Sequence, residues 1–433
     1  MSTAGNRRAD RKWTLPFFSI WSGQQLSLVG STVAQFALVW WLTKTTGSAT
    51  VLATATLVAL LPDIFLGPIA GAYVDRWNRR VVMILADGLV ALAALWLAYL
   101  FWTGSLAVWH VYVVMLIRSL GGMFHWPAMS ASTALMVPEE HLSRVAGLNQ
   151  TVKGALNIVG APLGALLMEV LPLHGVMLVD VGTALLAIIP LLFVLIPQPE
   201  RRVEARQASI WSDVRDGFRY LMGWKGLVVL IGAAMIFKIV LTPAFSLIPL
   251  LVSDHFGGDA VQLGMTDSAA GLGLLLGGLL LGVWGGFRRK IYTTLGGMII
   301  FGISFVALGM TPGSMFGGAL VSIFVAGFTI SLIDGPIMAI MQAGIAPELQ
   351  GRVFTLLGSL LSMTSPIGLI VAGPISDAMG ITIWYIVAGV LCGLIGVVGF
   401  FIPALVNIEQ NNNGSVKKDT VAAGTTPEFE ATI

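Results

Sequence analysis

The chain between residues 50 and 102 reads TVLATATLVALLPDIFLGPIAGAYVDRWNRRVVMILADGLVALAALWLAYLFW. Two apolar runs, 50–73 and 81–102, flank a short polar segment that holds one Asp and three Arg. Because an α-helix rises about 1.5 Å per residue, each run is long enough to cross the roughly 30 Å hydrocarbon layer of a membrane. The stretch therefore predicts two membrane-spanning helices joined by a basic loop.

The rest of the chain repeats this pattern. Apolar residues make up 56% of its 433 residues and charged residues only 11%, too few charges to cover a water-facing surface. Backbone groups in lipid must bond to one another, and long, uniformly apolar segments do so as helices. Hydropathy predicts twelve spans: 16–42, 50–73, 81–102, 108–129, 146–168, 175–196, 227–252, 267–287, 291–311, 315–338, 353–376 and 383–404. We expect an all-α polytopic membrane protein with twelve transmembrane helices.

The lysines and arginines indicate how the spans are oriented. Of the 24 basic residues, all but four lie at the chain ends or in alternate loops, and the opposite loops hold only Lys44. The positive-inside rule therefore places both termini and the central loop in the cytoplasm.

Short patches recur six spans apart. Pro138-Glu139 before the fifth span matches Pro347-Glu348 before the eleventh, and residues 161–164 resemble residues 365–368. An even number of helices per repeat gives both halves the same orientation, as in parallel-repeat transporters. The predicted organisation is a cytoplasmic segment 1–14, a six-helix bundle 15–196, a cytoplasmic linker 197–226 with an amphipathic helix, a second six-helix bundle 227–404, and a disordered cytoplasmic tail 405–433.

The polar segment after the second span combines Gly71 with Asp75, Arg76, Arg79 and Arg80. Glycine lets helices approach closely, and the Asp and arginines at a cytoplasmic mouth can pair with neighbouring helix ends. A loop that only sets topology needs no Asp. We interpret these five residues as a conformational latch.

Ionisable residues inside spans are costly and indicate functional sites. Arg118 lies near the middle of the fourth span and, because it stays protonated, needs a partner or a wet cavity; a structural salt bridge is the alternative. Asp63 and Asp334 are the candidate proton carriers, with Arg118 as the charge that adjusts their proton affinity. Asp87 and Asp180 fall nearer span ends and are interpreted as hydrogen-bonding groups at helix interfaces.

Other polar residues are candidates for lining a central cavity. They are Gln24, Gln25 and Gln35 in the first span and Lys238 in the seventh. In the fifth span, Gly160, Pro162 and Gly164 predict a helix kink, of functional or of packing origin.

The sequence contains no phosphate-binding loop and no metal-ligand spacing. The single cysteine, Cys392, matches no thiol or metal motif. We expect no enzymatic activity, no cofactor and no metal.

Several of these motifs resemble known families. Residues 71–80 resemble the signature of the major facilitator superfamily, and Arg118-x3-Gly122 resembles its second motif, found in proton-coupled exporters. The segment Gly160-Ala161-Pro162 departs from the antiporter motif, because Ala161 separates the glycine from the proline. Segments 20–24, 42–49, 66–68, 117–119, 137–140 and 351–368 together are similar to the bacterial macrolide efflux (Mef) proteins, a resemblance that covers roughly residues 15–403.

The resemblance implies a drug/proton antiporter of the bacterial inner membrane. Its two bundles would alternate between inward and outward access and export hydrophobic, cationic macrolides in exchange for protons. The expected partners are a small drug, protons and the lipid bilayer, with no nucleic acid, and the chain is expected to be a monomer. The resemblance also implies a separately made ATP-binding-cassette ribosome-protection protein as a companion.

Two other functions stay open at this stage. One is proton-linked import of a small solute, or lipid translocation. The other is a membrane receptor or scaffold without transport, which has no use for Arg118 and Asp63 inside spans.

Overall fold

The computed structural model describes residues 13–74, 76–198, 218, 221–345 and 347–410. In this part of the chain every regular element is a helix. The first half contains α2 (Thr14–Thr46), α3 (Ala49–Val74), α4 (Arg79–Thr103), α5 (Val108–Met136), α6 (Glu139–Val170) and α7 (Leu173–Phe193). The second half contains α9 (Lys225–Ser246), α11 (Ala260–Trp284), α12 (Lys290–Met310), α13 (Phe316–Gly344), α14 (Pro347–Met379) and α15 (Ile381–Phe401), with the short helices α10 (Ile248–Leu250) and α16 (Pro403–Val406) and a π-helical turn at Leu251–His255.

The prediction of twelve spans in two bundles is confirmed. Each predicted span corresponds to one long helix, and eleven of these helices are long and apolar enough to cross a membrane. The twelfth is α5, which has 29 residues. The expected amphipathic helix of the linker and most of the expected tail fall on residues 199–217, 219–220 and 411–433, outside the described residues.

Several helices extend beyond the apolar stretches that predicted them. The clearest case is α11, which begins at Ala260 rather than at residue 267. Asp259 caps it by accepting a hydrogen bond from the backbone N–H of Gln262 at 2.9 Å, while the Gln262 side chain accepts from the backbone N–H of Asp259 at 3.0 Å. Such a capping box satisfies two free N–H groups at a helix start. Hydropathy does not detect these polar first turns.

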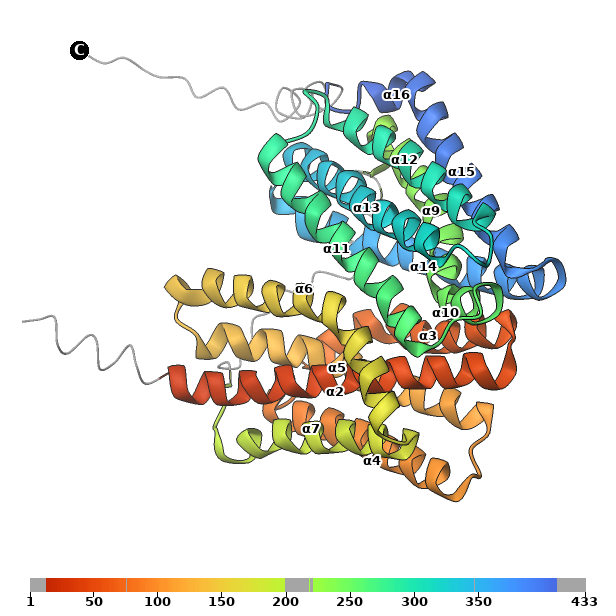
Figure 1. The fold of residues 1–433 in the computed structure, drawn as a ribbon. Coiled ribbons are helices and arrows are strands. Elements are labelled where there is room, and N and C mark those ends of the chain that lie inside the picture. The colour runs from red at the N-terminus through yellow and green to blue at the C-terminus, as the bar shows by residue number, and fades with distance from the viewer. Residues whose placement is uncertain (1–12, 75, 199–217, 219–220, 346, 411–433) are drawn as a thin grey trace, which may run out of the picture.

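The helices form two bundles that meet along two helix pairs (Figure 1). In the first bundle α2 packs on α6 and α7, and in the second α12 packs on α13 and α15. Between the bundles, α3 packs on α14 and α6 packs on α11.

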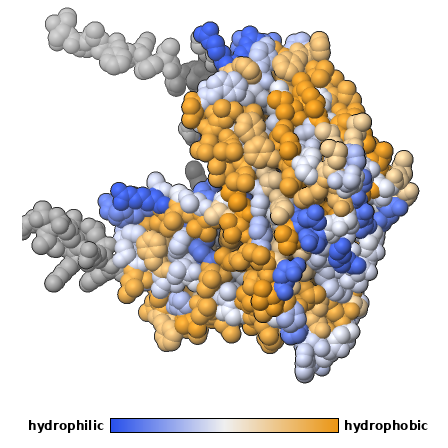
Figure 2. Space-filling view, viewed as in Figure 1, coloured by the Kyte–Doolittle hydropathy of each residue, from blue (hydrophilic) through white to orange (hydrophobic). Residues whose placement is uncertain are grey.

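Much of the face of the bundles that Figure 2 shows is apolar. Leu92 is 66% exposed, Phe193 81% and Val283 90%. A water-soluble protein seldom exposes apolar patches of this extent, whereas lipid tails solvate such side chains well. The protein is therefore a multi-pass membrane protein.

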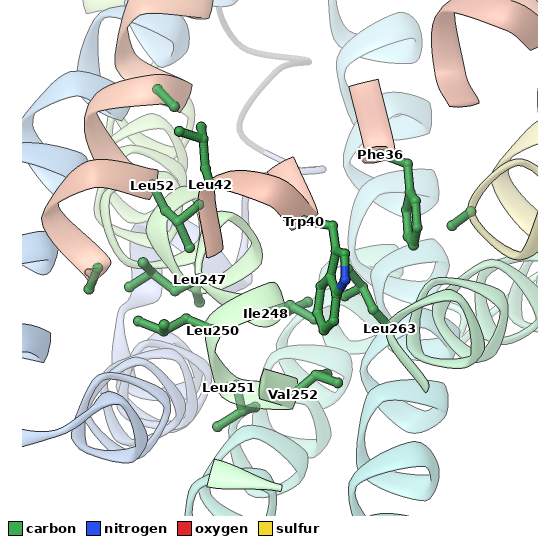
Figure 3. Close-up of a cluster of buried hydrophobic side chains, with 14 of the residues drawn as sticks. Phe36, Trp40, Leu42, Leu52, Leu247, Ile248, Leu250, Leu251, Val252 and Leu263 are labelled. Carbon is green, nitrogen blue, oxygen red and sulfur yellow. The ribbon is translucent and has the colours of Figure 1, made fainter. Parts of the chain in front are cut away.

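The two ends of the molecule differ. We call the end that carries the arginine-rich loops, including Arg79, Arg80 and Arg288, the basic end, and the opposite end the closed end. Figures 1 and 2 show the bundles diverging toward the basic end, which leaves a hollow between them. At the closed end a buried apolar cluster joins the bundles (Figure 3). It includes Trp40, Leu42 and Leu52 from α2 and α3, and Leu247, Ile248, Leu250, Leu251 and Val252 from the segment after α9.

Candidate functional site

A buried ion pair lies inside the first bundle. Arg118 of α5 places its Nη1 atom 2.5 Å from Oδ2 of Asp180 on α7. Asp180 is 1% exposed, and its other oxygen accepts a hydrogen bond from the Ser31 hydroxyl at 3.0 Å. The second Arg118 nitrogen, Nη2, donates to the Ser31 carbonyl oxygen at 2.9 Å. Both charges are thus paired and hydrogen-bonded, the condition under which a protein tolerates buried charges.

A second polar group lies beside this pair. Asp87 of α4 accepts a hydrogen bond from the Gln24 side chain at 2.8 Å, and Nε2 of His125 lies 3.4 Å from its other oxygen, without hydrogen-bond geometry. These three residues line a cavity of about 230 Å³ together with Ser31 and Arg118. The first bundle therefore contains two polar groups, contributed by α2, α4, α5 and α7, that line one cavity.

The two predicted proton carriers lie in separate cavities. The exposed Asp63 lines a cavity of about 540 Å³ with Gln35 and Arg118. Asp334 lines one of about 150 Å³ inside the second bundle with Lys238. The direct partner of Arg118 is Asp180, and no contact of Arg118 with Asp63 or Asp334 occurs among the described residues.

The three predicted glutamines have different surroundings. Gln24 is buried and bound to Asp87, while Gln35 lines two cavities near Arg118. Gln25 lines a groove of about 620 Å³ with Lys153, whose ammonium group lies 5.9 Å from the centre of the Trp126 ring. At this distance a cation–π interaction stabilises the ammonium group.

The predicted latch residues bind within the first bundle. Arg80 donates from Nη2 to the Leu192 carbonyl oxygen at 2.6 Å and from Nε to that of Leu191. Arg79 donates to the Ala131 carbonyl oxygen at 3.4 Å.

Of the other three latch residues, Arg76 is exposed and Gly71 lies within α3. Asp75 lies outside the described residues. The Arg80 contacts lie at the end of α7, where cations interact favourably with the helix dipole.

The predicted kink segment lies where α6 meets two other helices. A Cβ atom on Gly160 would come within 2.7 Å of Thr32, and one on Gly164 within 2.8 Å of Phe36, both on α2. Pro162 faces the second bundle, where a Cβ atom on Gly264 of α11 would lie 3.0 Å from it. Small residues permit this close helix packing.

At the closed end, Asp377 of α14 caps a helix of the other bundle. Its Oδ1 accepts a hydrogen bond from the backbone N–H of Ala49 at 2.6 Å, and its Oδ2 accepts from the backbone N–H of Thr50 and the hydroxyl of Ser48, both at 3.0 Å. A carboxylate at a helix start satisfies free N–H groups and interacts favourably with the dipole. This cap holds the bundles together.

Further hydrogen bonds cross between the bundles, including one from the Ser246 hydroxyl to the Leu52 carbonyl oxygen at 3.4 Å. The hydroxyls of Thr56 and Ser246 lie 2.6 Å apart, and Ser268 donates to the Ile158 carbonyl oxygen at 2.7 Å. Lys44, the single basic residue of its set of loops, donates to the Gly258 carbonyl oxygen at 3.3 Å.

Sequence reasoning missed three of these residues. His125 and Asp377 can be recognised as site residues only from the groups that they contact in the structure. A third residue, Asp267, is the first residue of its predicted span, yet it lies two helical turns inside α11, where it lines a cavity between the bundles. The Asp259-x-x-Gln262 pattern is the signal that could have located it.

Two bundles closed at one end and separated at the other, with charged groups buried between helices, define a membrane transporter. Residues 20–251 and 239–427 each match the Major Facilitator Superfamily. The chain belongs to this superfamily.

The chain is also similar to individual transporters. The chain is 36% identical to macrolide efflux protein A of Streptococcus pyogenes over 386 residues, which cover 89% of this chain and 95% of that protein. It is 27% identical to the multidrug efflux pump Tap of Mycolicibacterium fortuitum, over 87% of this chain and 93% of the pump. A bacterial homologue of the iron transporter ferroportin, solved in an inward-facing state, shares the fold with a TM-score of 0.69 and 14% identity, over 89% of this chain and 98% of that one.

Proposed function

We propose that this protein exports hydrophobic drugs, foremost macrolide antibiotics, in exchange for protons. The observation that carries the proposal is the 36% identity to macrolide efflux protein A, because it runs through 386 residues and so through both bundles. The cavities of about 540 Å³ beside Arg118 support it, since they fall in the size range of small-molecule sites.

In the proposed cycle the basic end faces the cytoplasm, so the structure corresponds to an inward-open state. Drug enters from the hollow, the contacts at the closed end then separate, and drug leaves outward. A proton that enters from outside neutralises a carboxylate in the cavity and favours the return to the inward-open state, in which the carboxyl releases the proton to the cytoplasm. Proton and drug are coupled if each changes the affinity for the other.

The proposed orientation is tested by reporter fusions. A reporter inserted between Thr103 and Val108 should report an outside location, and one inserted at Gln207 an inside location, because arginines and lysines stay cytoplasmic. The opposite pattern would overturn the orientation and make the structure outward-open.

Replacement of Asp63 tests the proposed proton carrier. We expect Asp63→Asn to abolish uphill efflux, because the amide mimics the protonated carboxyl permanently. Since Asp63 is exposed in its cavity, the stability of the protein should change by less than about 0.5 kcal/mol. The measurement is the rate of drug export from cells, with and without a protonophore.

Asp334→Asn is the companion variant for the second candidate. If Asp63→Asn and Asp334→Asn each keep the full, protonophore-sensitive efflux of the wild type, neither residue carries the proton. Asp87 and Asp180 would then be the next candidates to replace.

A susceptibility panel tests the exported substrate. In a bacterial host that lacks its own drug pumps, expression of the protein should raise the minimal inhibitory concentration of erythromycin severalfold. Export of erythromycin from the same cells should also be faster than from cells without the protein, and a protonophore should remove this difference. Unchanged susceptibility to every macrolide, with the protein present in the membrane, would contradict the proposal.

A further inference from the structure

One cavity between the bundles contains a carboxylate that the ion pairs above do not use. The cavity has a volume of about 540 Å³ and is bounded by α2, α3, α5 and α6 on one side and by α9, α10 and α11 on the other. Asp267 of α11 lines it. Among the residues that the structure describes, Asp267 forms no hydrogen bond and no ion pair.

The packing of α11 accounts for the direction of this side chain. A Cβ atom on Gly264 would lie 3.0 Å from Pro162 of α6 and one on Gly271 2.9 Å from Asn157, and between them the Ser268 hydroxyl donates to the Ile158 carbonyl oxygen. Asp267 is four residues beyond Leu263, which lies on the same side of the helix. Leu263 also lines the cavity, and Figure 3 shows it within the apolar cluster of the closed end.

The charges around the cavity do not balance. Arg118 lines the same cavity from the side of the first bundle, but its guanidinium is already paired with Asp180 and bound to the Ser31 carbonyl oxygen. Lys238 lies in the separate cavity of the second bundle. An ionised Asp267 thus has no compensating cation, a costly state inside a membrane protein.

The rest of the wall suits a hydrophobic ligand. Phe36 and Phe245 contribute aromatic rings, and Val39, Ile248 and Leu263 contribute aliphatic side chains. Aromatic faces attract cations, and a few polar groups in an apolar wall are typical of small-molecule sites. A lipophilic cation would match both the apolar wall and the unpaired carboxylate.

We infer that Asp267 is the residue of the inter-bundle cavity that binds the positive charge of a lipophilic, cationic substrate. The inference rests on the proposed drug export and deepens it, because it names the side chain that recognises the positive charge of the substrate. Asp63 and Asp334 line other cavities and take no part in this contact.

Equilibrium binding to the purified full-length protein tests the inference without transport. Tetraphenylphosphonium and tetraphenylborate have nearly the same shape and opposite charges. We expect the wild type to bind the cation more tightly than the anion. Asp267→Asn should reduce that preference at least about tenfold, equivalent to about 1.4 kcal/mol, and Asp267→Glu, which keeps the charge, should largely preserve it.

Glu169→Gln is the matched control, since it removes the same charge from an exposed position near the end of α6. It should leave the preference unchanged. The inference is overturned if the wild type does not prefer the cation, or if Asp267→Asn, eluting as a folded monodisperse protein, keeps the preference. Because neither probe is a macrolide, these results are independent of the erythromycin susceptibility that tests the proposed function.

Discussion

Asp180→Leu is expected to destabilise the folded protein by about 3–5 kcal/mol, the usual cost of removing one partner of a buried ion pair. The reason is that the variant leaves the Arg118 guanidinium, which is 11% exposed, without its counter-charge. The only remaining acceptor described for it is the Ser31 carbonyl oxygen. The measurement is the apparent melting temperature of the purified protein, together with the yield of monodisperse protein.

The double variant Arg118→Leu/Asp180→Leu separates the lost charge from the lost contact. Removing both charges should recover most of the melting temperature, because apolar residues of similar volume replace a buried pair at little cost. Ser31→Ala should cost only about 1 kcal/mol, the worth of an ordinary hydrogen bond. If Asp180→Leu melts at the wild-type temperature, the pair does not stabilise the first bundle.

Asp377→Ala is expected to shift the protein toward opening at its closed end. The carboxylate accepts two backbone N–H groups at the start of α3 and one hydroxyl, all from the other bundle. Hydrogen bonds to charged groups contribute about 1.5–3 kcal/mol, so the loss should change the ratio of the two states at least about tenfold.

Spin labels can measure this shift directly. Cys392 is the single cysteine, so a Cys392→Ala background accepts label pairs at Ser105→Cys and Met310→Cys, which are exposed at the closed ends of the first and second bundles. In Asp377→Ala the distribution of label distances should lengthen, and the transport rate should fall.

Asp259→Ala is the matched control for this experiment. Asp259 also caps a helix at its closed end, but it caps α11 within its own bundle. Asp259→Ala should lower the stability of the protein about as much as Asp377→Ala does, but it should not lengthen the distances between the labels. If Asp377→Ala gives the same distance distribution as Asp259→Ala and as the protein with neither substitution, the Asp377 contact does not hold the closed end together.

The fold was predictable because it depends on long apolar runs, which are easy to recognise in the sequence. An apolar run of about 20 residues has few options other than a membrane helix, so each predicted span has its helix. The helix starts were harder to predict, because polar turns such as Asp259–Gln262 lie outside the apolar run. The predicted start of α11 was seven residues too late, so Asp267 was predicted at the edge of a span and not inside the helix.

The candidate site was predictable only in part. Arg118 was recognisable as a buried charge that needs a partner, but the partner depends on which helices are neighbours in space. Asp180 lies 62 residues further along the chain, nearer the end of its predicted span. Asp377 and Ala49 are 328 residues apart, and no local pattern links a carboxylate at the end of one helix to the start of another.

The central claim, macrolide export coupled to protons, is tested most directly with purified protein in proteoliposomes. An acidic lumen should drive labelled erythromycin into the vesicles faster than into protein-free vesicles, which report the passive trapping of a weak base. A protonophore, or the Asp63→Asn substitution, should remove the difference. Entry at the same rate in vesicles with and without the wild-type protein would contradict the account.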